Sequence, residues 1–215
     1  MKKKVLGILI ILMTALTMPC AVLASSSVVT ETGLKDTVEE EISTFGSSDA
    51  YQEQVSSLES ADLSTYTETS DKVNVYIFRG NTCTHCLDAI IYFASIAKDY
   101  GKYFNIRTYE TYTNKANANL MTQVSSIMGD NATGVPYIVI GDKSYIGFAN
   151  SMADEILDQI KTEYAATDKY DVMDHLDEAT AAAKAKNDSV AVIVILVFIV
   201  IAGGIVLIVM ISKSK

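Results

Sequence analysis

The sequence predicts an α/β fold in which a central mixed sheet is flanked by helices. Short apolar runs typical of buried strands alternate with longer segments whose apolar residues recur every three or four positions, as in amphipathic helices. The predicted order of elements, β-α-β-α-β-β-α, combines a parallel crossover with an antiparallel hairpin. Residues 61–165 contain this pattern. A segment of about a hundred residues is sufficient for one hydrophobic core.

The first half of the pattern is a strand–helix–strand unit. Residues 73–78 are mainly β-branched and aromatic, as expected of a buried strand, and the Gly-Asn-Thr sequence at 80–82 predicts a turn. Residues 86–98 place apolar side chains at helical spacing, and residues 103–109 return to strand character.

The second half adds a helix, a hairpin and a last helix. Residues 115–128 have helical spacing and are followed by Gly129, a common helix terminator. Strands are predicted over 137–140 and 144–148, on either side of a Gly-Asp-Lys turn. Residues 152–164 form an amphipathic pattern that closes the domain.

The start of the chain is typical of an export signal. Lys2, Lys3 and Lys4 precede an apolar run, and small residues precede Ser25, so a signal peptide over residues 1–24 is predicted. A lipoprotein site at Cys20 is the alternative, although the proline before it is unfavourable for such a site.

The end of the chain predicts a membrane anchor. Residues 190–211 contain no charged residue and are long enough to cross a hydrocarbon core as one helix. Lys213 and Lys215 follow, which predicts a cytoplasmic tail over 212–215. The domain is therefore expected on the outer side of a cell membrane, attached through a single span.

Two polar segments flank the predicted domain. Residues 25–60 contain helical candidates at 34–45 and 49–63, which indicates a partly helical extension, although the composition also suits a solvated spacer. Residues 166–189 are acidic and rich in alanine, and we interpret them as a stalk.

The charge distribution excludes one large class of partners. All 26 acidic residues but only 12 of the 17 basic ones lie within residues 25–189, giving a net charge of −14. Such a region is not expected to bind nucleic acid. No cofactor is predicted.

The most informative motif is Cys83-Thr84-His85-Cys86, between a predicted strand and a predicted helix. Two thiols at this spacing can close and reopen a small disulfide ring, and a helix N-terminus favours the thiolate. Once Cys20 is removed with the signal peptide, no other cysteine remains for a structural disulfide framework. Alternatives are a structural disulfide, or half of a metal site, for which four good ligands cannot be assembled.

With this motif, and with Gly134-Val135-Pro136 before the hairpin, the chain resembles the thioredoxin superfamily over roughly residues 61–164. The resemblance implies a thioredoxin-like fold, a cis proline at Pro136 lying against the cysteines, and a redox-active Cys83–Cys86 disulfide. It also implies that Cys83 is the nucleophile, that Cys86 resolves the mixed disulfide and that Val135 and Pro136 shape the substrate groove.

Three positions deserve comparison with the family pattern. His85 resembles the histidine of disulfide-introducing and disulfide-isomerising members, where it stabilises the thiolate; as an alternative, it is an ordinary surface residue. Members often have an aromatic residue where Thr82 stands and a buried acid where Ile77 stands. These two departures argue against fast reduction of the thioredoxin type.

The expected function is that of a bacterial, membrane-tethered thiol–disulfide oxidoreductase. Its expected partners are secreted or cell-surface proteins with thiols or disulfides, together with a redox partner in the membrane. The alternative function is a non-catalytic thioredoxin-like module that binds proteins or assists an export system.

Overall fold

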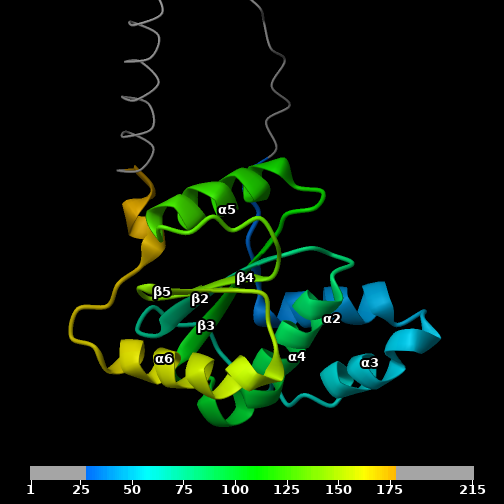
Figure 1. The fold of residues 1–215 in the computed structure, drawn as a ribbon. Coiled ribbons are helices and arrows are strands. Elements are labelled where there is room, and N and C mark those ends of the chain that lie inside the picture. Colours follow the sequence, from blue (N-terminus) through cyan, green and yellow to red (C-terminus); the bar gives the residue numbers. More distant parts are fainter. Residues whose placement is uncertain (1–27, 178–215) are drawn as a thin grey trace, which may run out of the picture.

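The computed structural model describes residues 28–177 (Figure 1). Its helices are α2 (Leu34–Phe45), α3 (Gln52–Glu59), α4 (Thr84–Tyr100), α5 (Lys115–Ile127) and α6 (Ala153–Ala165). Its strands are β1 (Thr32–Gly33), β2 (Val73–Arg79), β3 (Phe104–Glu110), β4 (Tyr137–Ile140) and β5 (Lys143–Ile146). Short 3-10 helices are η2 (Asp49–Tyr51), η3 (Asn150–Met152) and η4 (Val172–His175).

The five strands form one mixed sheet in the order β1-β3-β2-β4-β5. The pairs β1–β3, β2–β4 and β4–β5 are antiparallel, whereas β2 and β3 are parallel because α4 crosses over between them. The predicted mixed α/β fold is confirmed. The central strand β2 is buried along almost its whole length, which agrees with its nearly continuous apolar sequence.

Helices cover both faces of the sheet (Figure 1). Successive residues of a strand point to opposite faces, so Val75 and Ile77 belong to the core beneath α2, α4 and α6. Tyr76 and Phe78 belong to a second core with α5 and η4. The sheet is therefore a rigid middle layer, and both ends of β2 have fixed positions.

The predicted elements are observed with small changes at their ends. The helix predicted over 86–98 begins at Thr84, because Cys83 serves as its N-cap. The predicted hairpin is confirmed, with Gly141 at φ +57° in its turn. Strand β5 ends at Ile146, since Gly147 has φ +83° and donates its N–H to the Pro136 carbonyl at 2.7 Å.

The segment before residue 60 belongs to the core of the molecule. Strand β1 pairs with β3, and Leu34 is fully buried. Both helical candidates predicted in this segment are observed, as α2 and as η2 followed by α3. Their apolar residues are buried in the same cluster as α4, so a solvated spacer does not describe residues 32–59.

Part of the predicted stalk is also packed on the sheet. Asp171 accepts hydrogen bonds from the Tyr76 hydroxyl at 2.7 Å and from the Asn74 amide at 2.9 Å. Val172 is buried in the second core. Residues 171–175 therefore form an integral part of the fold.

The remaining predictions concern the two ends of the chain. Within residues 28–177, no helix combines the length and the apolar character needed to span a bilayer. The predicted signal peptide (1–24), most of the stalk, the membrane helix (190–211) and the tail (212–215) lie outside the described residues.

Candidate redox site

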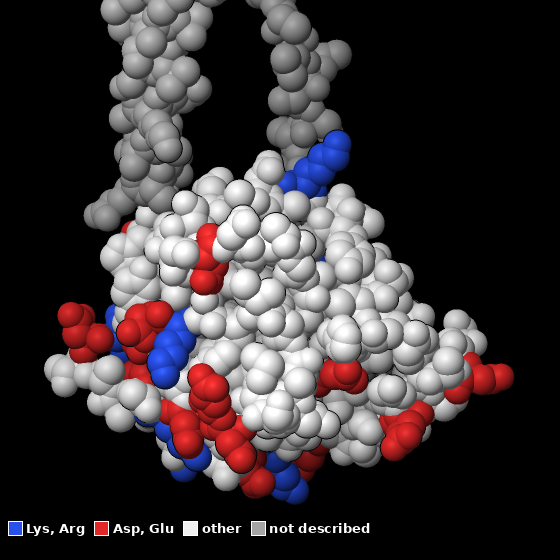
Figure 2. Space-filling view, viewed as in Figure 1, with Lys and Arg blue, Asp and Glu red and all other residues white. Residues whose placement is uncertain are grey.

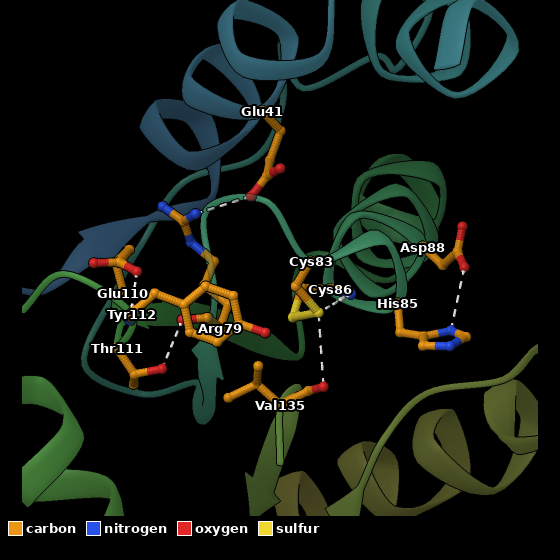
Figure 3. Close-up of a disulfide and its surroundings, with 10 residues drawn as sticks. All are labelled: Glu41, Arg79, Cys83, His85, Cys86, Asp88, Glu110, Thr111, Tyr112 and Val135. Carbon is orange, nitrogen blue, oxygen red and sulfur yellow. Dashed lines mark hydrogen bonds and ion pairs between the residues drawn. A yellow bond between two sulfur atoms is a disulfide. The ribbon is translucent and has the colours of Figure 1, made fainter. Parts of the chain in front are cut away.

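Cys83 and Cys86 form a disulfide at the N-terminus of α4, with their Cα atoms 5.2 Å apart (Figure 3). The backbone N–H of Cys86 donates to the Cys83 sulfur at 3.2 Å. The first turn of α4 contains no acidic residue that would compensate the positive end of the helix dipole. A thiolate on Cys83 would therefore be stabilised by the helix itself.

The two sulfurs differ in access. Cys86 is fully buried beneath the start of α4, whereas Cys83 is partly exposed. Only Cys83 can therefore meet an external thiol or disulfide without a change in the fold. This asymmetry agrees with the roles that were predicted for the two cysteines.

Val135 and Pro136 lie across from the disulfide, although they are far from it in sequence. Strands β2 and β4 are antiparallel neighbours, and the pair Phe78–Tyr137 places the end of β2 beside the start of β4. The Val135 carbonyl oxygen lies 3.6 Å from the Cys83 sulfur (Figure 3). The Val135–Pro136 bond is cis, as the resemblance implies.

His85 lies apart from the sulfurs. Its side chain is 72% exposed, and Nδ1 is 3.9 Å from the Asp88 carboxylate, to the right of the sulfurs in Figure 3. No contact joins the ring to Cys83 among the described residues. The predicted direct role of His85 beside the sulfur is therefore not visible in this arrangement.

Arg79 also directs its charge away from the disulfide, as Figure 3 shows. The guanidinium is buried and forms ion pairs with Glu40 and, at 2.9 Å, with Glu41. The second oxygen of Glu41 has no hydrogen-bond partner among the described residues. Burial raises the pKa of Glu41 to about 7, although the positive charge of Arg79 opposes this shift.

The buried acid Glu41 is not among the residues predicted from the sequence, although the sequence contains a signal for it. Leu34, Val38, Glu41 and Phe45 are spaced by four, three and four residues, which places Glu41 on the buried stripe of α2. The strand position expected to hold an acid is occupied by the buried Ile77. The buried carboxyl group in Figure 3 is that of Glu41, which comes from α2 and not from the strand β2.

No known protein family matches the chain, and no curated protein or solved structure is found to be similar to it. Within residues 28–177, no cluster of three or more His, Cys, Asp or Glu side chains is arranged to hold a metal ion. The function is therefore inferred from the geometry of the site.

Proposed function

We propose that this protein is a thiol–disulfide oxidoreductase that acts on other proteins through Cys83 and Cys86. The observation that carries the proposal is the asymmetric disulfide at the start of α4. Its accessible sulfur faces the carbonyl of Val135 at 3.6 Å, and its buried sulfur belongs to Cys86. A bridge that served only to stabilise the fold would need no such exposure.

The exchange conserves atoms and electrons. In the oxidising direction, a substrate thiolate attacks the Cys83 sulfur, the Cys83–Cys86 bond breaks, and Cys86 leaves as a thiolate that takes up a proton. A second substrate thiolate then attacks the substrate sulfur of the mixed disulfide and releases the Cys83 thiolate. The substrate loses two electrons, and the protein's disulfide gains them. Reduction of a substrate disulfide follows the same steps in reverse.

The proposal includes a thioredoxin-like fold. Three features support it: the β2–α4–β3 crossover, the β4–β5 hairpin and the placement of Val135-Pro136 opposite a CxxC motif. In such a fold, the backbone at Val135 would pair with an extended segment of the substrate. The carbonyl of Val135 is available for this role because it faces the disulfide (Figure 3).

We also propose that the domain is tethered to the outer face of a bacterial cell membrane. The uncharged run at 190–211 and the two lysines after it support this placement. There the domain would exchange disulfides with secreted or surface proteins and be recycled by a redox partner in the membrane.

The decisive experiment is to trap the mixed disulfide. In Cys86→Ser, the resolving thiol is absent, so we expect substrate proteins to accumulate on Cys83 and to be released by dithiothreitol. Cys83→Ser is the matched control, because its remaining thiol is buried, and it should trap nothing. If Cys86→Ser traps no protein in cells and exchanges with no small disulfide in vitro, the oxidoreductase proposal fails and a non-catalytic binding module is favoured.

A further inference from the structure

An exposed aromatic side chain lies beside the disulfide. Tyr112 is 58% exposed, and among residues 28–177 no other Phe or Tyr is as open to solvent. A tyrosine ring at such a place offers an apolar face and a polar hydroxyl that a second molecule can contact. Tyr112 is therefore a candidate contact for a molecule that approaches the site.

The turn that presents Tyr112 is held in place by hydrogen bonds from both sides. The N–H and the hydroxyl of Thr111 donate to the Arg79 carbonyl at 2.8 and 3.0 Å. The Glu110 carboxylate accepts the N–H of Tyr112 at 2.6 Å and that of Thr113 at 3.0 Å. The backbone that carries the ring thus has a fixed position.

The ring rests on Gly80, at the first residue of the turn that leads to Cys83. A β-carbon on Gly80 would collide with the Cε2 and Cζ atoms of Tyr112. The Gly80 carbonyl accepts the N–H of Cys83 at 3.2 Å, so glycine and cysteine are the two ends of one tight turn. In Figure 3 the Tyr112 ring and His85 lie on opposite sides of the disulfide, and the tyrosine hydroxyl points toward the sulfurs.

Few charged residues lie in the loops around the disulfide, although the Glu110 carboxylate accepts the backbone N–H of Tyr112. None of the residues 80–87, 111–114, 131–141 and 144–153 is Asp, Glu, Lys or Arg, although the domain is strongly acidic. Figure 2 shows the centre of one face without charged side chains and acidic residues gathered along its lower rim. Apart from the carboxylates of Glu110 and Asp88, a group that binds beside the disulfide would therefore be recognised by apolar contact and backbone pairing.

We propose that Tyr112 determines substrate specificity, its ring packing against an apolar side chain next to the reacting cysteine of an extended polypeptide. This inference rests on the proposed function. An apolar residue beside a cysteine is accessible mainly before a protein has folded, because such residues are buried afterwards. The substrate class is therefore polypeptides that have not finished folding, and native proteins with exposed polar cysteines are poor substrates.

The test compares peptides that differ only next to one cysteine. Wild-type protein, Tyr112→Ala and Tyr112→Phe are each reacted with reduced peptides in which Leu, Phe, Ser or Asp flanks the cysteine. We expect the wild type to react about tenfold faster with the Leu and Phe peptides than with the Ser and Asp peptides, as a contact worth about 1.4 kcal/mol would give. Tyr112→Phe should keep this preference, and Tyr112→Ala should lose it.

Exchange with glutathione distinguishes failure of the role proposed for Tyr112 from failure of the oxidoreductase proposal. Glutathione has no apolar side chain next to its cysteine, so all three proteins should react with it at the same rate. If the wild type reacts with neither glutathione nor any peptide, the proposed function itself fails. If Tyr112→Ala keeps the peptide preference, or slows glutathione and peptides equally, the role of Tyr112 is overturned and the oxidoreductase proposal stands.

Discussion

At the scale of single residues, the Cys83 sulfur receives its stabilisation from the backbone of α4. The N–H of Cys86 reaches this sulfur at 3.2 Å, whereas His85 and Arg79 are each engaged with carboxylates elsewhere. Backbone donors at a helix start are fixed in place, so their effect does not depend on a side-chain conformation.

Because the backbone and not His85 contacts the sulfur, we predict that His85 has a weak effect on the reactivity of Cys83. In the reduced protein, His85→Ala should change the rate of Cys83 alkylation by iodoacetamide at pH 7 by less than about threefold, because an exposed ring is screened by solvent. The rate is measured by mass spectrometry of the labelled chain. A loss of reactivity greater than about tenfold would show that the ring turns toward the sulfur in the reduced state.

The buried acid predicts a dependence of stability on pH. Since the pKa of Glu41 rises from 4.5 to about 7 on folding, the folded chain holds this proton more tightly than the unfolded chain. The free energy of unfolding should therefore fall by up to about 3 kcal/mol as the pH increases from about 4.5 to about 7.

Urea unfolding of Glu41→Gln, followed by circular dichroism, checks this prediction. Glutamine has similar size and no proton to lose, so the difference in unfolding free energy from the wild type should change across this pH window. If the unfolding free energies of wild type and variant change in parallel from pH 4.5 to pH 7, the raised pKa of Glu41 is contradicted.

At the scale of elements, the segment from β1 to α3 is part of the sheet and of its covering layer. Strand β1 extends the sheet beyond β3, and Thr37 of α2 shares a hydrogen bond of 2.8 Å with Thr108 of β3. The ion pairs of Arg79 join α2 to the end of β2. The strand that leads to the disulfide is thus held by an element far away in sequence.

Leu34→Ala provides a direct test of this packing. Leu34 is fully buried, so its truncation should lower the free energy of unfolding by about 2–5 kcal/mol. The exposed Val28, whose truncation to alanine should cost less than about 0.5 kcal/mol, is the matched control. Equal midpoints of urea unfolding for the two variants would mean that α2 is not part of the cooperative core.

The sequence was sufficient for elements whose period is strong and insufficient where position depends on distant contacts. The run at 73–78 and the spacing at 115–128 predicted β2 and α5 to within a residue or two. Strand β1 has only two residues and exists because β3 offers it a free edge, which no local pattern reveals. For the same reason, neither the contact of Tyr112 with Gly80 nor the ion pair of Glu41 with Arg79 could be predicted.

At the scale of the whole molecule, negative charge is in excess but unevenly distributed, and Figure 2 shows one face whose centre has no charged side chain. Residues 25–189 have a net charge of −14, and residues 80–87, 111–114, 131–141 and 144–153 near the disulfide contribute none of it. The apolar contact near Cys83 and the long-range electrostatic attraction or repulsion of the acidic domain therefore affect substrate binding independently.

This separation predicts a dependence on salt. When salt is raised from about 20 to about 200 mM, disulfide exchange with a cysteine peptide that has a basic tail should slow several-fold. Exchange with a peptide that has an acidic tail should accelerate, because salt screens attraction and repulsion alike. A neutral peptide with the same residues next to its cysteine is the control. The exchange rates are measured by stopped flow. Equal salt dependence for the three peptides would contradict the prediction.

The disulfide bridges residues only three positions apart, within the first turn of one helix. It therefore fastens no distant parts of the chain to each other, and the five-stranded sheet with its two cores holds the architecture in place. Opening the ring leaves the scaffold intact. Under the proposed function, the packed sheet would keep the fold unchanged through repeated rounds of disulfide exchange.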